Sequence, residues 1–142
     1  MGEHSERSVL VTRTALGRYQ ATNTRGGVID FGTGEDADDD FTPVELLLVA
    51  LAGCSAADVD FITVKRAEPT SFTVSARGDK IRDEQGNRLV DLRLVFDVRF
   101  ADDEAGEAAR AVLPRALAQS HDRLCTVSRT VELGTAVSAE LA

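Results

Sequence analysis

The sequence has 142 residues and a mass of 15.2 kDa, which suits a single folded domain. Sixteen lysine and arginine residues face 24 aspartate and glutamate residues, giving a net charge of −8. The basic residues are scattered singly, which excludes the concentrated basic surface that binds nucleic acid or an anionic membrane. We therefore expect one domain over residues 1–142.

The beginning of the sequence is polar and lacks the apolar segment of a secretory signal, which predicts a cytoplasmic protein. The longest apolar run, residues 46–52, is far shorter than the ~20 residues that span a bilayer. The two cysteines, Cys54 and Cys125, are 71 positions apart. Without an export signal, they are either buried small hydrophobic residues or a redox pair.

The first third of the chain predicts short strands. Residues 9–11, 19–24 and 28–31 are separated by turn signals at residues 16–18 and 26–27, which together indicate an antiparallel meander. Residues 35–40 (EDADDD) carry five carboxylates in six positions and predict a solvated loop, with calcium binding as a less favoured alternative. Residues 32–37 match a dinucleotide glycine fingerprint only formally, because a phosphate site must be electropositive.

A long helix is predicted from Thr42 to about residue 65. Thr42 suits the N-cap, Pro43 suits the first helical position, and Glu45 completes a capping box. Between residues 44 and 57 only Glu45 and Ser55 are polar, so we expect this half of the helix to be buried on all sides.

The remaining chain alternates strands and helices. Period-2 patterns predict strands over residues 72–77 and 90–100, and a helix follows over residues 105–119, in which Pro114 should cause a kink or a break. A short helix over residues 126–132, closed by Gly134, and a final strand over 135–141 complete the prediction. This order favours an α+β fold with helices packed on antiparallel sheets.

Position alone favours Cys54 as an inert packing residue, because burial raises the pKa of a thiol. A reactive Cys54 requires a cation from elsewhere in the fold, and Arg25, before the turn at residues 26–27, is the best candidate. Zinc is a disfavoured alternative, since His121 and Cys125 at i,i+4 spacing would give only three ligands together with Cys54.

Two motifs resemble the OsmC/Ohr family of osmotically inducible and organic-hydroperoxide-resistance proteins. They are residues 42–54 (TPVELLLVALAGC) and residues 125–128 (CTVS). The resemblance implies an α+β fold in which antiparallel sheets pack around two long central helices of an intertwined homodimer. Its active sites would lie at the subunit interface.

The resemblance also implies a thiol-dependent peroxidase acting on organic or hydrogen peroxide without metal or organic cofactor. Cys54 would attack the peroxide, Cys125 would resolve the sulfenic acid as a disulfide, and Arg25 would stabilise the thiolate. A thioredoxin-type or lipoyl dithiol would be the reductant. The rival hypothesis is a non-catalytic OsmC-like dimer that binds a small apolar molecule at its interface.

Glu45 is the carboxylate that the resemblance assigns to orienting the arginine. Nine positions at ~1.5 Å rise separate it from Cys54 by roughly 13 Å along one helix, so it would have to serve the neighbouring subunit's Cys54. Peroxidase members carry this glutamate one residue earlier, where the present chain has Val44. The alternative is that Glu45 only closes the capping box with Thr42.

Overall fold

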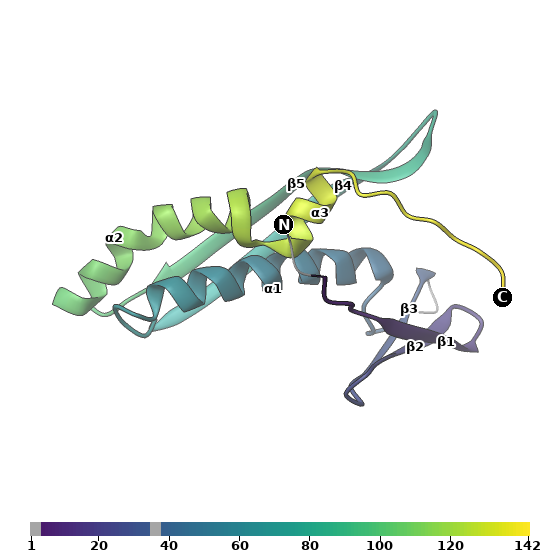
Figure 1. The fold of residues 1–142 in the computed structure, drawn as a ribbon, viewed down its shortest axis with the longest axis horizontal. Helices are drawn as coiled ribbons and strands as arrows, with labels where there is room; N and C mark the ends of the chain where they lie inside the picture. Colours follow the sequence, from purple (N-terminus) through teal and green to yellow (C-terminus); the bar gives the residue numbers. More distant parts are fainter. Residues whose placement is uncertain (1–3, 35–37) are drawn as a thin grey trace. The chain divides into compact units, whose positions relative to one another are not determined.

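The computed structural model describes residues 4–34 and 38–142. The described residues form three α-helices, one π-helical turn and two antiparallel sheets, so the predicted α+β class is confirmed (Figure 1). Contacts divide the chain into two units, residues 1–47 and 48–142, and each is described by itself. One domain over residues 1–142 stays a prediction.

The first unit holds a three-stranded sheet in the order β1-β2-β3. Its strands are β1 (Val9–Ala15), β2 (Arg18–Asn23) and β3 (Val28–Gly32), all antiparallel, which confirms the predicted meander. Tyr19 and Phe31 are register partners on β2 and β3, and their rings stack with centroids 5.6 Å apart. This aromatic pair stabilises the register of the sheet.

Local hydrogen bonds shape the turn between β2 and β3. The Asn23 side-chain oxygen accepts the backbone N–H groups of Arg25 at 3.0 Å and Gly27 at 2.8 Å. Gly26 has a φ of 89°, a conformation that favours glycine. The turn therefore has a defined backbone, and it presents the exposed Arg25 at its tip.

The acidic segment after β3 is only partly described, because residues 35–37 lie outside the described residues. Arg18 pairs with Asp40 at 2.7 Å and with Asp38 at 3.5 Å. Asp38 and Asp39 are exposed, as expected for a solvated loop, and Asp40 is partly exposed. The Arg18 guanidinium offsets the repulsion between the carboxylates, which their sequence alone does not show.

Helix α1 (Pro43–Thr63) begins where its sequence predicts. The Thr42 N–H donates to Glu45 Oε1 at 2.9 Å and the Glu45 N–H donates to Thr42 Oγ1 at 3.2 Å, which is a complete capping box. The helix ends at Thr63, two residues before the predicted end.

The expectation that the first half of α1, residues 44–57, is buried on all sides is wrong for the single chain. Its buried residues are Leu51, Ser55, Val59 and Thr63, which form one stripe at i,i+4 spacing. Val49 is 49% exposed and Phe61 is 73% exposed. One chain supplies packing partners for only one face, so the opposite apolar face stays uncovered.

Helix α1 is also long and apolar enough to cross a membrane, by length and composition alone. Core helices of soluble proteins meet the same criterion.

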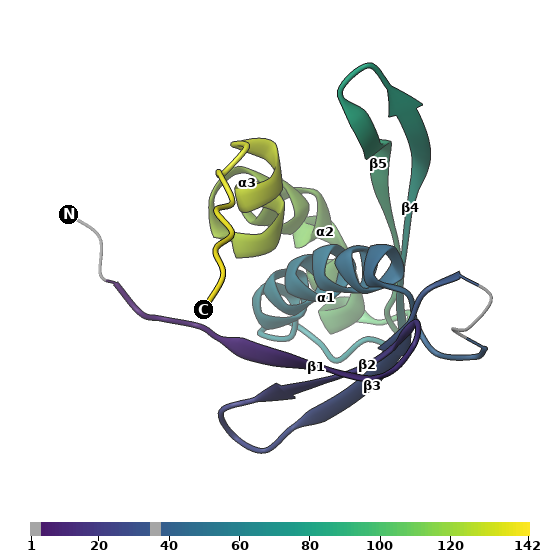
Figure 2. The same ribbon diagram turned by 90° about the vertical axis from the view of Figure 1, so that its right-hand side faces the viewer.

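The second unit contains a long hairpin of β4 (Ser71–Asp83) and β5 (Gly86–Arg99). Its alternating burial confirms the two strands predicted from the period-2 pattern. Phe72 and Phe96 pack edge to face on the more buried side, with centroids 6.3 Å apart. Figures 1 and 2 show the hairpin running beside the helices of this unit, with its turn projecting past them.

Helix α2 (Glu104–Gln119) continues into a π-helical turn, η2 (Ser120–Leu124), and then into α3 (Thr126–Glu132). Both predicted helices are confirmed. Of the kink or break expected at Pro114, the break is wrong, because α2 runs through this residue unbroken, and the kink stays a prediction. Residues 135–141 form no strand, contrary to expectation: an extended segment needs a neighbouring strand for its backbone groups, and Val137 and Leu141 are 93% and 100% exposed.

Candidate functional site

The second unit brings Cys54 and Cys125 together. Cys54 lies in the middle of α1 and is half-buried, whereas Cys125 is fully buried at the junction of η2 and α3. The Cys125 thiol and the backbone N–H groups of Val127 and Thr126 lie close enough to Cys54 to shift its pKa. Residues 71 positions apart in the sequence thus become neighbours at the beginning of α3.

Cys125 is the N-cap of α3 and has a structural role there. Its Sγ accepts the backbone N–H of Ser128 at 3.5 Å. Its own N–H donates to the Ser120 carbonyl oxygen at 2.8 Å, the hydrogen bond that closes the π-helical turn. Single π-helical turns are frequent at functional sites. The irregular backbone between α2 and α3 is what places this thiol against α1.

Burial raises the pKa of the Cys54 thiol above its usual value. The N–H groups of Val127 and Thr126 lower it by stabilising the thiolate, whereas the neighbouring Cys125 raises it further. The balance favours the neutral thiol. A reactive thiolate at this position therefore needs a cation in addition to the groups that the second unit places around it.

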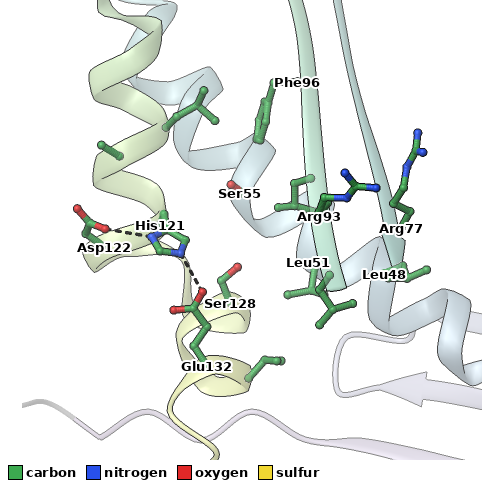
Figure 3. A pocket seen from close by; sticks show the side chains of 15 residues that line it. Leu48, Leu51, Ser55, Arg77, Arg93, Phe96, His121, Asp122, Ser128 and Glu132 are labelled. Atoms are coloured by element: carbon green, nitrogen blue, oxygen red, sulfur yellow. Dashed lines mark hydrogen bonds and ion pairs between the residues drawn. The ribbon is translucent and has the colours of Figure 1, made fainter. Parts of the chain in front are cut away.

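A cavity of about 510 Å³ lies within the second unit (Figure 3), and its lining includes Ser55 and Ser128 but neither cysteine. Its apolar wall comes from α1, β5 and α2, through Leu48, Leu51, Leu92, Leu94, Phe96 and Leu117. Ser55, which follows Cys54, and Ser128, three residues after Cys125, belong to the polar side. A cavity of this size and lining suits a small organic molecule with an apolar body.

His121 lies on the polar side of the cavity between two carboxylates. Its Nδ1 is 3.0 Å from Asp122 Oδ1 and its Nε2 is 2.8 Å from Glu132 Oε1, as Figure 3 shows. These contacts connect η2 to the end of α3. Among residues 4–34 and 38–142, no group of three or more His, Cys, Asp and Glu side chains is arranged to hold a metal ion, including the zinc set considered above.

The carboxylates of Asp122 and Glu132 raise the pKa of His121. A raised histidine pKa stabilises the folded chain at pH below ~6.5, the unfolded value, and this contribution disappears as the pH rises through the folded pKa. We expect Glu132→Gln to lower the pKa of His121, because a neutral amide replaces an anion. An NMR titration of the His121 ring protons measures this, with the His4 resonance as internal reference, and an unchanged midpoint would contradict the paired arrangement.

Arg25 and Glu45 belong to the first unit, whereas both cysteines belong to the second. Arg25 lies at the β2–β3 turn, as predicted. Glu45 closes the capping box, which was the alternative to a catalytic role, and the capping bond uses its Oε1. Their participation in one site with Cys54 stays a prediction.

Comparison with known proteins identifies the family. The family model for OsmC-like proteins matches residues 34–140 of the chain. This chain belongs to the OsmC-like family. An uncharacterized protein of Mycobacterium tuberculosis is 33% identical to this OsmC-like chain over 132 residues, covering 92% of this chain and 93% of the relative.

Solved structures share the fold of this OsmC-like chain. A hypothetical protein from Aquifex aeolicus superposes with a TM-score of 0.73 at 20% identity, covering 93% of this chain and 91% of the other. An organic hydroperoxide resistance protein, OsmC, from Legionella pneumophila superposes with a TM-score of 0.62 at 13% identity, covering 92% and 91%. At these identities the likeness is one of fold, and the predicted OsmC-like fold is confirmed.

Proposed function

We propose that this OsmC-like chain is a thiol-dependent peroxidase that reduces organic peroxides, or hydrogen peroxide, through Cys54 and Cys125. The observation that carries the proposal is the proximity of the two thiols in the second unit, which also holds a cavity with an apolar wall. The similarity to a protein named for organic hydroperoxide resistance supports the same substrate class.

The proposed cycle has two steps and needs no metal or organic cofactor. The Cys54 thiolate attacks one peroxide oxygen, so that an S–O bond forms, the O–O bond breaks, and the alkoxide takes up a proton and leaves as an alcohol. The Cys125 thiol then attacks the sulfenic sulfur, which forms the disulfide and releases water. A dithiol of the thioredoxin or lipoyl type reduces the disulfide and restores both thiols.

The first step needs a cation, because burial raises the pKa of Cys54. We assign this charge to Arg25, whose guanidinium would stabilise both the thiolate and the departing oxygen. Glu45 would orient Arg25, since its capping bond engages only Oε1.

We further propose that the protein is an intertwined homodimer that works in the cytoplasm. The exposed apolar residues of α1, such as Val49 and Phe61, are costly to leave in water and would be covered by a second copy. Gly53, directly before Cys54, has open space where a Cβ would stand, so another backbone can approach the thiol there.

A second candidate function is the binding of a small apolar molecule without catalysis. The 510 Å³ cavity and the raised pKa of Cys54 both favour it, since a unit that combines an apolar cavity with an unactivated thiol describes a binding protein equally well. In that case the cysteines would be oxidised only slowly and incidentally.

Thiol counting after addition of tert-butyl hydroperoxide to the reduced protein separates the two candidates. The peroxidase loses both thiols rapidly. Cys125→Ser accumulates a stable sulfenic acid at Cys54, because the resolving thiol is absent, and Cys54→Ser does not consume peroxide. Loss of thiols no faster than in free cysteine would reject the peroxidase and support the binding function.

A further inference from the structure

Ser120 is a fully buried polar residue at the junction of α2 and η2. Its hydroxyl donates to Asp58 Oδ2 at 2.9 Å. The Ser55 hydroxyl oxygen lies 3.1 Å from the Ser120 hydroxyl oxygen. Because a hydroxyl carries one hydrogen, and that of Ser120 is given to Asp58, Ser55 must be the donor of this second bond.

These bonds attach Ser120 to the part of α1 that carries Cys54. Ser55 is the next residue after Cys54, and Asp58 lies one helical turn further along α1. Hydrogen bonds at both positions fix the distance and the rotation of this segment relative to the end of α2. A buried network of this kind is rigid when every member has a partner.

The backbone of Ser120 holds the other cysteine. Its carbonyl oxygen accepts the Cys125 N–H at 2.8 Å, which closes η2. One residue therefore bonds through its side chain to the segment of Cys54 and through its main chain to Cys125. The positions of both thiols are therefore set relative to Ser120.

We propose that Ser120 is a positioning residue, which holds Cys125 at the distance from Cys54 that formation of their disulfide requires. This inference rests on the proposed function for its role in turnover, in the step that resolves the sulfenic acid. The pairing of the two thiols itself is measurable without any peroxide.

Equilibration with glutathione provides this measurement. Oxidised glutathione accepts two electrons: one cysteine thiolate displaces a glutathione thiol to form a mixed disulfide, and the second cysteine displaces another to close the protein disulfide. The position of this equilibrium gives the effective concentration of one protein thiol at the other. Ser120→Ala removes both side-chain hydrogen bonds, to Asp58 and from Ser55, and should lower it by at least about tenfold, the loss expected for one buried hydrogen bond.

Two further variants make the test specific. Ser55→Ala leaves the Ser120–Asp58 bond intact and should lower the effective concentration by a smaller factor in the same direction, which keeps the inference testable if Ser120→Ala fails to fold. Ala109→Gly, at a fully buried position in α2, destabilises the unit without touching the network and should leave the effective concentration unchanged.

The outcomes separate the inference from the proposed function. A lower effective concentration in Ser120→Ala but not in Ala109→Gly supports positioning by Ser120. Equal values in the parent and in Ser120→Ala, or equal losses in Ser120→Ala and Ala109→Gly, overturn it. A parent that forms the disulfide with glutathione yet ignores tert-butyl hydroperoxide overturns the peroxidase proposal, while the comparison of variants still decides the role of Ser120.

Discussion

Replacing Arg25 by alanine is expected to slow the reaction of Cys54 with tert-butyl hydroperoxide by about 100-fold at neutral pH, the loss typical of a charged group that stabilises a transition state. The physical reason is that the Cys54 thiol ionises poorly without a nearby positive charge. Burial raises the pKa of Cys54, and the N–H groups of Val127 and Thr126 offset this only in part. Without the guanidinium, less thiolate is present and the departing oxygen loses the positive charge that Arg25 supplies.

The pH dependence gives this prediction a signature. Removing a cation raises the pKa of a thiol, so the rate of Arg25→Ala should recover as the pH increases, and the gap to the parent should narrow. Stopped-flow measurement of peroxide consumption over a pH series tests this. Arg25→Lys keeps the charge but loses the planar guanidinium, so its rate of peroxide consumption should lie between those of the parent and Arg25→Ala.

Arg13 offers a matched control, since it is an exposed arginine on β1 of the same sheet. Arg13→Ala removes the same charge from the chain and should leave the rate near that of the parent. Equal losses in the two variants would mean that only net charge matters. If Arg25→Ala reacted with the peroxide as fast as the parent protein, Arg25 would not be part of the site.

Gly106→Ala is expected to lower the free energy of unfolding by about 3 kcal/mol, in the upper range for overpacking in a core. Gly106 is buried in the first turn of α2, where its N–H donates to the N-cap Asp103 at 2.7 Å. A Cβ on this residue would lie 1.9 Å from the Ala101 carbonyl oxygen. The backbone would have to move, and the cap would be strained.

Helix propensity alone predicts the opposite sign, because alanine favours a helix over glycine by about 1 kcal/mol. Ala105→Gly, the reverse exchange at the exposed neighbouring position, should therefore cost only about 1 kcal/mol. Urea unfolding of the two variants compares them directly. A Gly106→Ala protein more stable than the parent would show that the close approach to Ala101 is not present in solution.

Features that depend on neighbouring residues were predictable from the sequence. The capping box of Thr42 and Glu45 forms because its donors and acceptors lie three residues apart. The β4–β5 hairpin follows the period-2 pattern because each strand has one buried face. Gly134 ends α3 with a φ of 64°, as a glycine after a helix is expected to do.

Features that depend on distant partners were not predictable. The apolar pattern of α1 predicts burial on every side, but burial is decided by what packs against the helix, and one chain covers a single stripe. The segment 135–141 has an alternating pattern but no strand beside it. A strand needs a partner, and a pattern in one segment does not supply it.

The residues of the candidate site also differ in whether the sequence could predict them. The cysteines were found from their motifs and from the resemblance to the OsmC/Ohr family. Ser120 belongs to no sequence motif. Its side-chain contacts form only when α1 and α2 pack together, because its partner Asp58 lies 62 positions earlier in the sequence. Ser120 is fully buried although the three polar residues that follow it, 121–123, are exposed.

Mapping the disulfide after oxidation tests the central claim most directly. A mixture of unlabelled and ¹⁵N-labelled reduced chains is treated with one equivalent of tert-butyl hydroperoxide, denatured, alkylated and digested for mass spectrometry. We expect a linked peptide pair that contains Cys54 and Cys125, both of the same isotope, because the two thiols meet within one chain. Mixed-isotope pairs, or sulfinic acid at Cys54 with Cys125 still reduced, would contradict the account.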